Sequence, residues 1–157
     1  MELIEFTLNG RREAVAAEPT EAMIDLLRRQ FHLFSVREAC SVGLCGSCTI
    51  SVDGKQVSAC LMLCGQAVGR SIETVDIFTE NGDLHPIQQA FVEHNAFQCS
   101  YCTPGFLLAT RELLSVTPHP SDDEIREFLA GNICRCGSYQ KIVEAVQDAA
   151  TRVAAQG

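Results

Sequence analysis

The sequence predicts an α+β protein whose first half is rich in strands and whose second half is helical. Two hairpin signals support the first half: apolar and polar residues alternate before Asn9-Gly10, and two more short strand patterns flank Asp53-Gly54. The composition changes at Asn81-Gly82-Asp83, which reads as a linker, and helical periodicity follows it. We therefore expect two domains, residues 1–78 and 83–157.

The strand-rich half should contain two hairpins, one helix and one further strand. Ile4, Phe6 and Leu8 place apolar side chains on one face of the first strand. Apolar residues recur at helical spacing after Pro19-Thr20, which we expect to open a helix. The remaining strands are expected at residues 11–16, 49–52, 56–60 and 71–76.

The second half should contain four helices with separate start signals. Thr103-Pro104 is expected to supply an N-cap with proline at the first helical position. Ser121-x-x-Glu124 forms a capping box before a helix that should stop at Gly131. Ser138 is the candidate cap of the last helix. The first of the four is expected at residues 86–94.

Composition and charge exclude some classes of function. Of the 157 residues, 46% are hydrophobic and 20% are charged, as in ordinary soluble proteins. The net charge of −8 argues against nucleic-acid binding, which needs a basic face. No stretch approaches the ~20 apolar residues of a membrane span. The N-terminus lacks the features of an export signal, so we expect a cytoplasmic location.

Nine cysteines in such a chain indicate metal binding or redox chemistry, because cytosolic thiols stay reduced. The first set is Cys40, Cys45 and Cys48, followed by Cys60. This C-x4-C-x2-C…C spacing is that of the plant-type [2Fe–2S] loop. Gly43 and Gly46 lie between these ligands, and we expect them to let backbone amides approach the cluster sulfurs.

Two other interpretations of the first set are less consistent with the sequence. Zinc also takes four thiolates, but its usual C-x2-C pairs do not contain a four-residue interval with interleaved glycines. A disulfide framework conflicts with the missing export signal. The first set therefore predicts a [2Fe–2S] cluster.

The second set consists of two pairs, Cys99 with Cys102 and Cys134 with Cys136, each flanked by helices. This repeated pattern suggests two similar halves that bring their cysteine pairs together at the centre of a four-helix arrangement. Spacing alone leaves zinc open as the metal. The helix starts after Cys102 and Cys136 favour a cluster, because helix N-termini stabilise anions and lower thiolate pKa values.

The two cysteine sets occur within longer segments that resemble a known family. These segments are CSVGLCGSC (40–48), LHPIQQAFVEH (84–94), FQCSYCTPGF (97–106) and GNICRCGSYQKIVEAV (131–146). Together they resemble the small iron–sulfur subunit, or N-terminal region, of the molybdenum hydroxylases, the xanthine dehydrogenase and aldehyde oxidoreductase group. The resemblance extends over nearly the whole chain.

The resemblance implies a β-grasp ferredoxin-like domain followed by a pseudo-twofold four-helix bundle, each with one [2Fe–2S] cluster. It implies a large partner subunit that binds molybdopterin and a medium one that binds FAD, in a heterotrimer or its dimer. By the same resemblance, Gln98 and Cys136 contact the pterin, with Cys136 also an iron ligand. Electrons would pass from molybdenum through the bundle cluster, then the ferredoxin-type cluster, to FAD.

The chain departs from the family pattern at three places. The family commonly has glycine at the positions of Asn95 and Ser100, and Thr-Gly where Gly137-Ser138 stands here. Asn tolerates positive φ, so Asn95 is expected to keep the turn. The exchange at 137–138 bears on the backbone amides near Cys136. None of these changes removes a ligand.

Other reactive side chains are expected to have structural roles. Cys64, the ninth cysteine, is interpreted as a small buried apolar residue rather than a redox-sensitive thiol. Arg135 could tune a cluster or remain solvated. The four histidines are interpreted as capping or surface residues: His32, His85, His94 and His119.

The sequence contains no nucleophile elbow, P-loop or dinucleotide-binding glycine motif. We therefore expect no catalytic residue in this chain, and an electron-transfer role within a molybdenum-dependent oxidoreductase. Two alternatives remain: a stand-alone ferredoxin-like carrier and a zinc-stabilised interaction module. The substrate pocket would belong to the large subunit.

Overall fold

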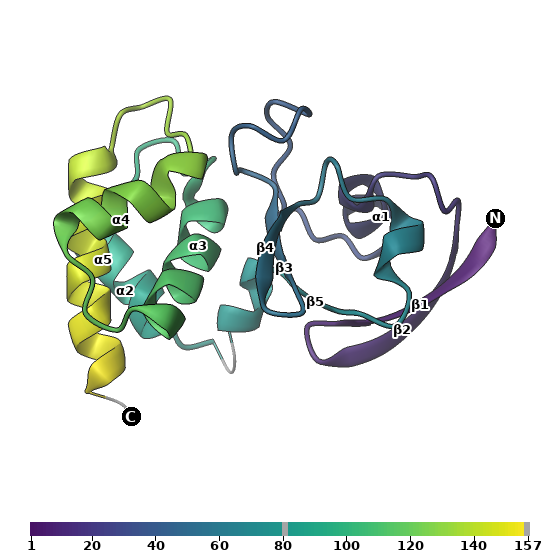
Figure 1. The fold of residues 1–157 in the computed structure, drawn as a ribbon, viewed down its shortest axis with the longest axis horizontal. Coiled ribbons are helices and arrows are strands. Elements are labelled where there is room, and N and C mark those ends of the chain that lie inside the picture. Colours follow the sequence, from purple (N-terminus) through teal and green to yellow (C-terminus); the bar gives the residue numbers. More distant parts are fainter. Residues whose placement is uncertain (80–81, 156–157) are drawn as a thin grey trace.

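The computed structural model describes residues 1–79 and 82–155, arranged as a strand-rich half beside a helical half (Figure 1). Asn81, part of the expected linker, lies outside the described residues, as do the last two residues of the second expected domain. The described apolar residues form two hydrophobic clusters. One lies between Ile4 and Ile72, and the other between Phe78 and Ala150.

The first half is a mixed five-stranded sheet with one helix, α1 (Met23–Gln30). Its strands follow the order β2-β1-β5-β3-β4. The outer pairs β1–β2 and β3–β4 are antiparallel hairpins, while β5 lies parallel to β1 and antiparallel to β3. The strands are β1 (Glu2–Leu8), β2 (Arg11–Ala17), β3 (Thr49–Val52), β4 (Lys55–Ser58) and β5 (Ser71–Glu73).

The sequence pattern of the first half explains its core. Ile4, Phe6 and Leu8 are all buried on one face of β1, as the alternation predicted. Both hairpin predictions are confirmed: Asn9-Gly10 and Asp53-Gly54 all take positive φ, as the turn type requires. The helix begins three residues later than Thr20, because Ala22 is still extended.

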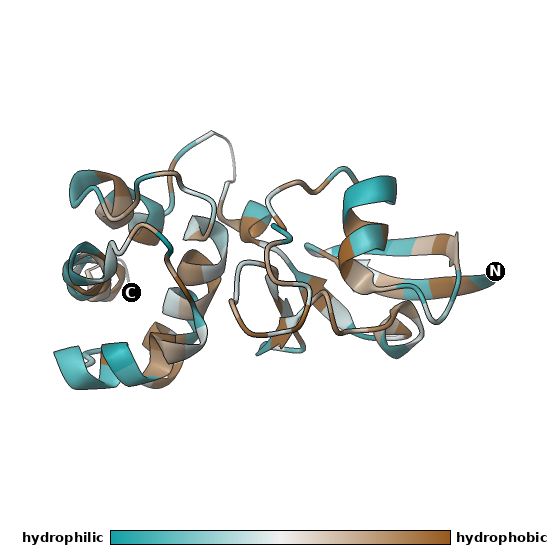
Figure 2. Ribbon diagram, turned by 90° about the horizontal axis from the view of Figure 1, so that it is seen from above, coloured by the Kyte–Doolittle hydropathy of each residue, from teal (hydrophilic) through white to brown (hydrophobic). Residues whose placement is uncertain are grey.

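The second half consists of four helices that pack around the second hydrophobic cluster. Hydrophilic and hydrophobic residues lie on different faces of the helices (Figure 2). No helix in the described part of the chain is long and apolar enough to cross a membrane. The helices are α2 (Pro86–Glu93), α3 (Thr103–Val116), α4 (Asp122–Phe128) and α5 (Tyr139–Ala154), with short 3₁₀ turns η1 (Cys64–Ala67), η2 (Val75–Phe78) and η3 (Leu129–Gly131).

The helix starts agree in part with the sequence. The capping box of Ser121 and Glu124 is confirmed at the start of α4. The N-cap prediction for Thr103 is wrong: Cys102 already has helical dihedral angles, so Thr103 lies inside the first turn. Ser138 occupies the N-cap position of α5 but makes no side-chain cap hydrogen bond.

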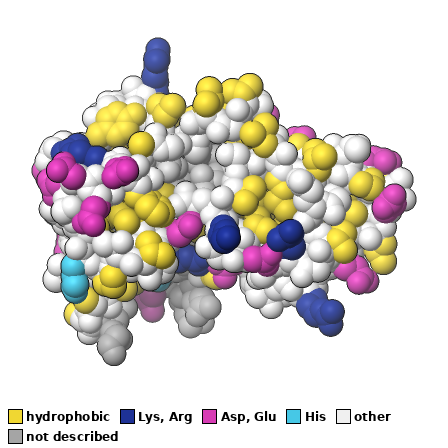
Figure 3. Space-filling view, in the orientation of Figure 1, with side chains coloured by type: hydrophobic (Ala, Val, Ile, Leu, Met, Phe, Trp, Pro, Cys, Tyr) yellow, Lys and Arg dark blue, Asp and Glu magenta, His cyan; other side chains and the backbone are white. Residues whose placement is uncertain are grey.

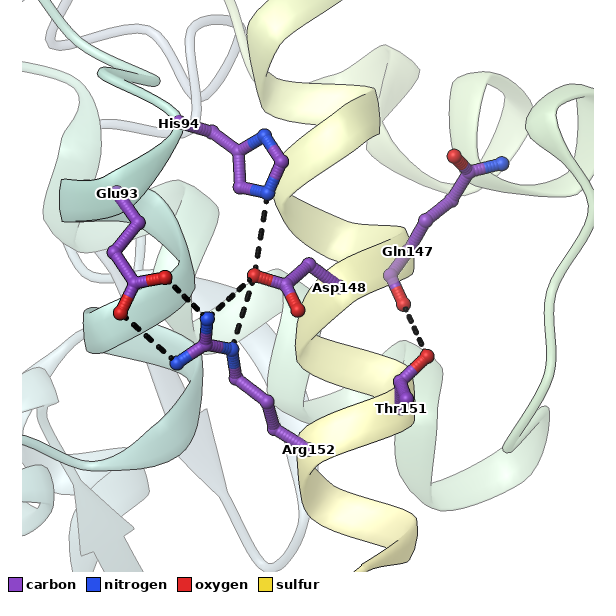
Figure 4. Close-up of polar contacts among 6 residues, drawn as sticks. All are labelled: Glu93, His94, Gln147, Asp148, Thr151 and Arg152. Atoms are coloured by element: carbon purple, nitrogen blue, oxygen red, sulfur yellow. Dashed lines mark hydrogen bonds and ion pairs between the residues drawn. The ribbon is translucent and has the colours of Figure 1, made fainter.

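A polar network joins α2 to α5 on the outside of the helical half (Figure 4). Arg152 lies between Asp148, whose Oδ2 is 2.9 Å from Nε, and Glu93, whose Oε1 is 3.2 Å from Nη1. His94 Nε2 is 3.2 Å from the same Asp148 oxygen. Hydrogen bonding to Arg152 holds the pKa of Asp148 below its usual range.

The two halves meet along α3, which packs against β3, β4 and the 3₁₀ turn η2. Arg111 of α3 pairs with Glu73 at the end of β5. The Tyr101 hydroxyl, just before α3, donates to the carbonyl of Glu38, and the Arg37 guanidinium lies 5.2 Å from the Tyr101 ring centroid. Tyr101 and Glu38 belong to the cysteine-bearing segments of the two halves, so these segments are in contact at the interface.

Candidate metal centres

The first cysteine set lies on the loop between α1 and β3, completed by Cys60 just after β4. The β3–β4 hairpin makes this possible, since Thr49 pairs with Ser58 and the amide of Ala59 donates to the carbonyl of Cys48 at 3.2 Å. The hairpin thus returns the chain beside Cys48. Cys60 therefore lies beside the loop that carries the other three cysteines, although the whole hairpin separates them in the sequence.

The two predicted glycines have conformations that other residues rarely adopt. Gly43 has φ +73° and Gly46 has φ +69°. A Cβ at Gly43 would overlap the Leu61 side chain. A Cβ at Gly46 would lie 2.5 Å from Nδ2 of Asn132 and 2.7 Å from the carbonyl oxygen of Gly131. The loop therefore needs glycine at both positions, and at Gly46 the reason includes the other half of the molecule.

Backbone amides of the loop create an environment that favours a thiolate. The amides of Val42, Cys45 and Leu44 lower the pKa of Cys40 to about 6, and the Leu44 nitrogen lies 3.4 Å from Sγ. Burial raises the pKa of Cys48 to about 11. The Cys45 thiol also lowers the pKa of Cys40, and the thiols of Cys60 and Cys45 act on the pKa of Cys48, so the four thiols lie close together.

The second set joins two loops of the helical half. Cys99 and Cys102 lie between α2 and α3, while Cys134 and Cys136 lie between η3 and α5. The thiols of Cys136 and Cys134 act on the pKa of Cys99, and the thiols of Cys134 and Cys99 act on the pKa of Cys102, so thiols of both loops lie close together. The prediction that the two sequence-distant pairs come together is confirmed.

The electrostatics of the second set resemble those of the first. The amide of Tyr101 lowers the pKa of Cys99, and burial raises the pKa of Cys102 to about 12. Burial acts to raise the pKa of Cys134, but the Ser138 amide, 3.5 Å from Sγ, helps to lower it below its usual value. Each set thus contains thiols whose ionised form the backbone stabilises.

The departures from the family pattern are compatible with this backbone. Asn95 has φ +49°, as predicted, and Ser100 has φ +62°, so both keep a conformation that glycine adopts most easily. Gly137 has φ +78°, and the next amide, that of Ser138, points to the Cys134 sulfur. The exchange at 137–138 therefore leaves an amide directed at a candidate ligand.

The donor sets fit a two-iron cluster. All nine cysteines are free. Among the described residues, no three His, Cys, Asp or Glu side chains converge on a point suited to one metal ion. Each set nevertheless supplies four free thiols close together, and a [2Fe–2S] cluster needs two thiolates on each iron. The buried hydroxyl of Thr103, next to Cys102, has no hydrogen-bond partner among the residues that the structure describes.

Comparisons with known proteins agree with this geometry. Residues 12–95 match the family described as "2Fe-2S iron-sulfur cluster binding domain", and residues 74–147 match "[2Fe-2S] binding domain". The chain is 47% identical over 146 residues to the nicotine 6-hydroxylase small subunit of Paenarthrobacter nicotinovorans, covering 93% of this chain and 88% of that one. It is 44% identical to the nicotinate dehydrogenase small FeS subunit of Eubacterium barkeri, covering 96% of each.

A solved structure extends the similarity to the fold. The crystal structure of quinoline 2-oxidoreductase from Pseudomonas putida 86 contains a chain with 40% identity and a TM-score of 0.95, covering 99% of this chain and 97% of that one. The chain belongs to the family of [2Fe–2S] small subunits of the molybdenum hydroxylases. Its ferredoxin-like fold is thereby confirmed.

Gln98, expected to contact the pterin in this iron–sulfur subunit, lies beside the second set. Its Nε2 donates to the carbonyl of Cys136 at 3.3 Å. Gln98 is exposed and Cys136 is half-buried, so both reach the surface at the same point. The adjacent Arg135 is exposed.

Cys64 and His85 have the structural roles expected of them. Cys64 is fully buried in the first hydrophobic cluster, and burial raises the pKa of its thiol to about 11. His85 caps α2, since its Nδ1 accepts from the Ile87 amide at 3.2 Å, and its ring stacks on Phe78 at 4.7 Å.

Three residues at the contact between the cysteine loops were missed by the sequence reasoning: Tyr101, Gly105 and Asn132. Asn132 is buried, and its Nδ2 donates to the Gly46 carbonyl at 3.2 Å. A Cβ at Gly105 would overlap the same carbonyl. The position of an asparagine two residues before Cys134 was the available signal, but its partner lies 86 positions away.

Proposed function

We propose that this chain relays electrons, within a heteromeric molybdopterin-dependent hydroxylase or dehydrogenase, from the molybdenum centre of a large subunit to FAD on a medium subunit. The observation that carries the proposal is that two complete four-thiol sets lie on loops in direct contact. The Ile133 amide, next to Cys134, donates to the carbonyl of Cys45 at 2.9 Å. The relatives are named as small subunits of a nicotine hydroxylase and a nicotinate dehydrogenase.

We assign eight cysteines as iron ligands: Cys40, Cys45, Cys48 and Cys60 in one site, and Cys99, Cys102, Cys134 and Cys136 in the other. A [2Fe–2S] cluster bound at each site would supply a one-electron carrier. The protein contributes the amides that stabilise sulfur charge, such as those of Leu44 and Ser138, and the glycines that let the first loop fold.

The finer description of the fold belongs to the same proposal. We interpret the first half as a β-grasp domain, residues 1–78, and the helical half as a pseudo-twofold four-helix bundle, residues 83–157. The two separate hydrophobic clusters support two domains. The approach of the two cysteine pairs to one another, from two loops that each precede a helix, supports an internal twofold.

Exposed apolar side chains around the cysteine loops support a subunit rather than a stand-alone carrier. Several gather along the upper edge of the molecule in Figure 3, where Figure 1 has the cysteine loops. A freely soluble carrier would leave this surface in water. We propose that it is covered by the molybdopterin and FAD subunits of a cytoplasmic heterotrimer or its dimer. The side chains are Val42, Leu44, Leu61, Leu63, Tyr101, Ile133 and Tyr139.

Within this complex we assign no catalytic residue to the chain and give Gln98 and Cys136 the contact with the pterin. Their shared surface position supports this role, since Gln98 already hydrogen-bonds the Cys136 backbone. Cys136 would then be both an iron ligand and the residue nearest the pterin. The substrate would be bound elsewhere, in the large subunit.

Metal analysis and EPR of the purified complex test the assignment. We expect about four irons per chain and two distinct [2Fe–2S] signals on reduction. Stoichiometric zinc without a cluster spectrum would refute it in favour of a zinc module. Purification at high salt tests the partners: a subunit stays with two larger chains, whereas a carrier elutes alone.

Cys136→Ser tests the bridging role. We expect reduction of the clusters by substrate to be impaired more than reduction by dithionite, because only the first requires the pterin contact. Equal impairment by both reductants would remove this role from Cys136 while leaving it as a ligand.

A further inference from the structure

One carbonyl group of the first cysteine loop is held by residues of both halves. The oxygen of Gly46, between Cys45 and Cys48, accepts from Thr49 Oγ1 at 2.8 Å within its own half. From the other half it accepts from Asn132 Nδ2 at 3.2 Å. The backbone of Gly105 closes the remaining side, since any Cβ there would overlap this oxygen. The Gly46 carbonyl therefore has little freedom to move.

Asn132 is itself fixed within the helical half. It is only 5% exposed, and its backbone amide donates to the carbonyl of Leu129 at 2.9 Å at the end of η3. The next residue, Ile133, donates to the carbonyl of Cys45. Two successive residues of the second cysteine loop thus bind two successive carbonyls of the first, with candidate ligands directly adjoining the contact on each side.

Other contacts hold the halves together away from this point. Arg111 pairs with Glu73, and these two side chains are each 29% exposed. Tyr101 donates to the carbonyl of Glu38. The halves would therefore remain associated without the Asn132 amide, and what its loss would free is the position of one cysteine loop relative to the other.

We propose that Asn132 is a positioning residue that fixes the Gly46–Ser47 peptide against the Cys134 loop and so sets the spatial relation of the two clusters. The proposal rests on the ligand assignment above. It differs from a role in binding either cluster, because Asn132 supplies no ligand and its partner atom is a backbone carbonyl of the opposite half. It also differs from a general role in holding the two halves together. The Arg111–Glu73 ion pair has that general role and serves as the control.

The test uses Asn132→Asp in the whole complex. The aspartate keeps the shape of the side chain but directs a carboxylate oxygen, which cannot donate, at the Gly46 carbonyl. Iron content and the EPR spectrum of each cluster alone report on cluster binding. The magnetic interaction between the two reduced clusters reports on their relative position.

We expect Asn132→Asp to retain both clusters and to shift or abolish the wild-type magnetic interaction. Gly105→Ala should have the same effect by crowding the Gly46 carbonyl from α3. The control Arg111→Gln should leave the interaction at its wild-type value. An unchanged interaction in both test variants, or an equal change in Arg111→Gln, would overturn the proposal.

Loss of iron from both test variants would also overturn it, because the contact would then serve cluster binding rather than position. If only one test variant loses iron, the interaction measured in the other decides. Failure of the underlying function is distinguishable from all of these outcomes, since wild-type complex would then lack the two [2Fe–2S] signals.

Discussion

On the ligand assignment proposed above, each of the two cysteine sites uses four thiols, but the two sites are built in different ways. The first takes three ligands from one nine-residue loop and gains the fourth from a hairpin, so its geometry depends on local backbone conformation at Gly43 and Gly46. The second takes two ligands from each of two loops separated by α3 and α4. Its geometry depends on how the helices pack.

This difference implies different sensitivities. A site built by one loop should respond to changes in that loop's dihedral angles and tolerate changes in distant helices. A site built between helices should be coupled to the stability of the whole helical half, because bringing its two loops together requires the core. The contrast can be tested by changing one site at a time.

Ligand substitutions should have the largest effects. We expect Cys48→Ser and Cys102→Ser each to lose one cluster, leaving roughly two of about four irons per chain, since each cluster holds two. Because Cys102 joins two loops of the helical half, its variant should also show the larger fall in melting temperature. Iron content, EPR and thermal unfolding measure these effects.

Cys48→Ser is the internal control for Cys102→Ser, since each variant should retain the EPR signal that the other loses. Loss of both EPR signals in either variant would contradict the prediction that each site binds its cluster independently of the other. Equal falls in melting temperature would contradict the difference in how the sites are built.

Alanine at the positive-φ glycines should have the next largest effect. Gly46→Ala must accept both an unfavourable φ and a clash with Asn132 and Gly131, so we expect a loss of roughly 2–4 kcal/mol. Gly137→Ala meets no atom within 4 Å and should cost only the backbone strain, roughly 1–2 kcal/mol. Denaturant unfolding measures both losses of stability. Equal losses would mean that Asn132 moves away from the new methyl group at no cost in free energy.

Removing the His85 cap should have a smaller effect, confined to α2. We expect His85→Ala to cost about 1 kcal/mol through loss of the bond to the Ile87 amide. Burial, with Arg111 nearby, lowers the pKa of His85 in the folded protein. The unfolded chain therefore takes up a proton first as pH falls, and this residue's share of stability should be lost below about pH 6.5.

Thermal unfolding of wild type and His85→Ala between pH 5 and 8 separates the two effects. The difference between the proteins should be largest above about pH 6.5 and should narrow below it. A constant difference across this range would mean that the folded protein does not exclude the protonated imidazole.

Cys64→Ala should have the smallest effect on function. Cys64 is fully buried and is not one of the eight assigned ligands, although it shares a hydrophobic cluster with Cys48 and Cys60, so both EPR signals and the iron content should match wild type. The loss of a small buried side chain should cost about 1 kcal/mol, measured by denaturant unfolding. Loss of iron would show that this thiol supports the first site.

The sequence predicted what depends on local chemistry. Hairpin turns at Asn9-Gly10 and Asp53-Gly54 and the capping box at Ser121 follow from backbone preferences that a few adjacent residues determine. The family followed from the resemblance of four longer segments, and the two cysteine sets were recognised from their spacing together with the helices that flank them. The prediction for Thr103 failed because Cys102, directly before it, already has helical dihedral angles, which the local sequence did not indicate.

The contact between the two halves could not be predicted from the sequence. Nothing near Asn132 or Gly105 indicates that both meet the carbonyl of Gly46, because that meeting depends on how α3 packs against the sheet. Asn132 reads as part of a loop, and Gly105 as an unfavourable residue in a helix. The role of each residue is visible only in the folded structure, where both contact the Gly46 carbonyl.

The absence of a side chain at Gly105 has a consequence for how this family can recombine. The carbonyl oxygen of Gly46, in the other half, occupies the space that a Cβ at residue 105 would need. The choice of residue at position 105 is therefore limited by a segment some sixty positions earlier in the sequence. A side chain at residue 105 would therefore require the Gly46 backbone in the other half to move. A chimaera joining the first half of one relative to the helical half of another is therefore compatible only where Gly46, Gly105 and Asn132 match.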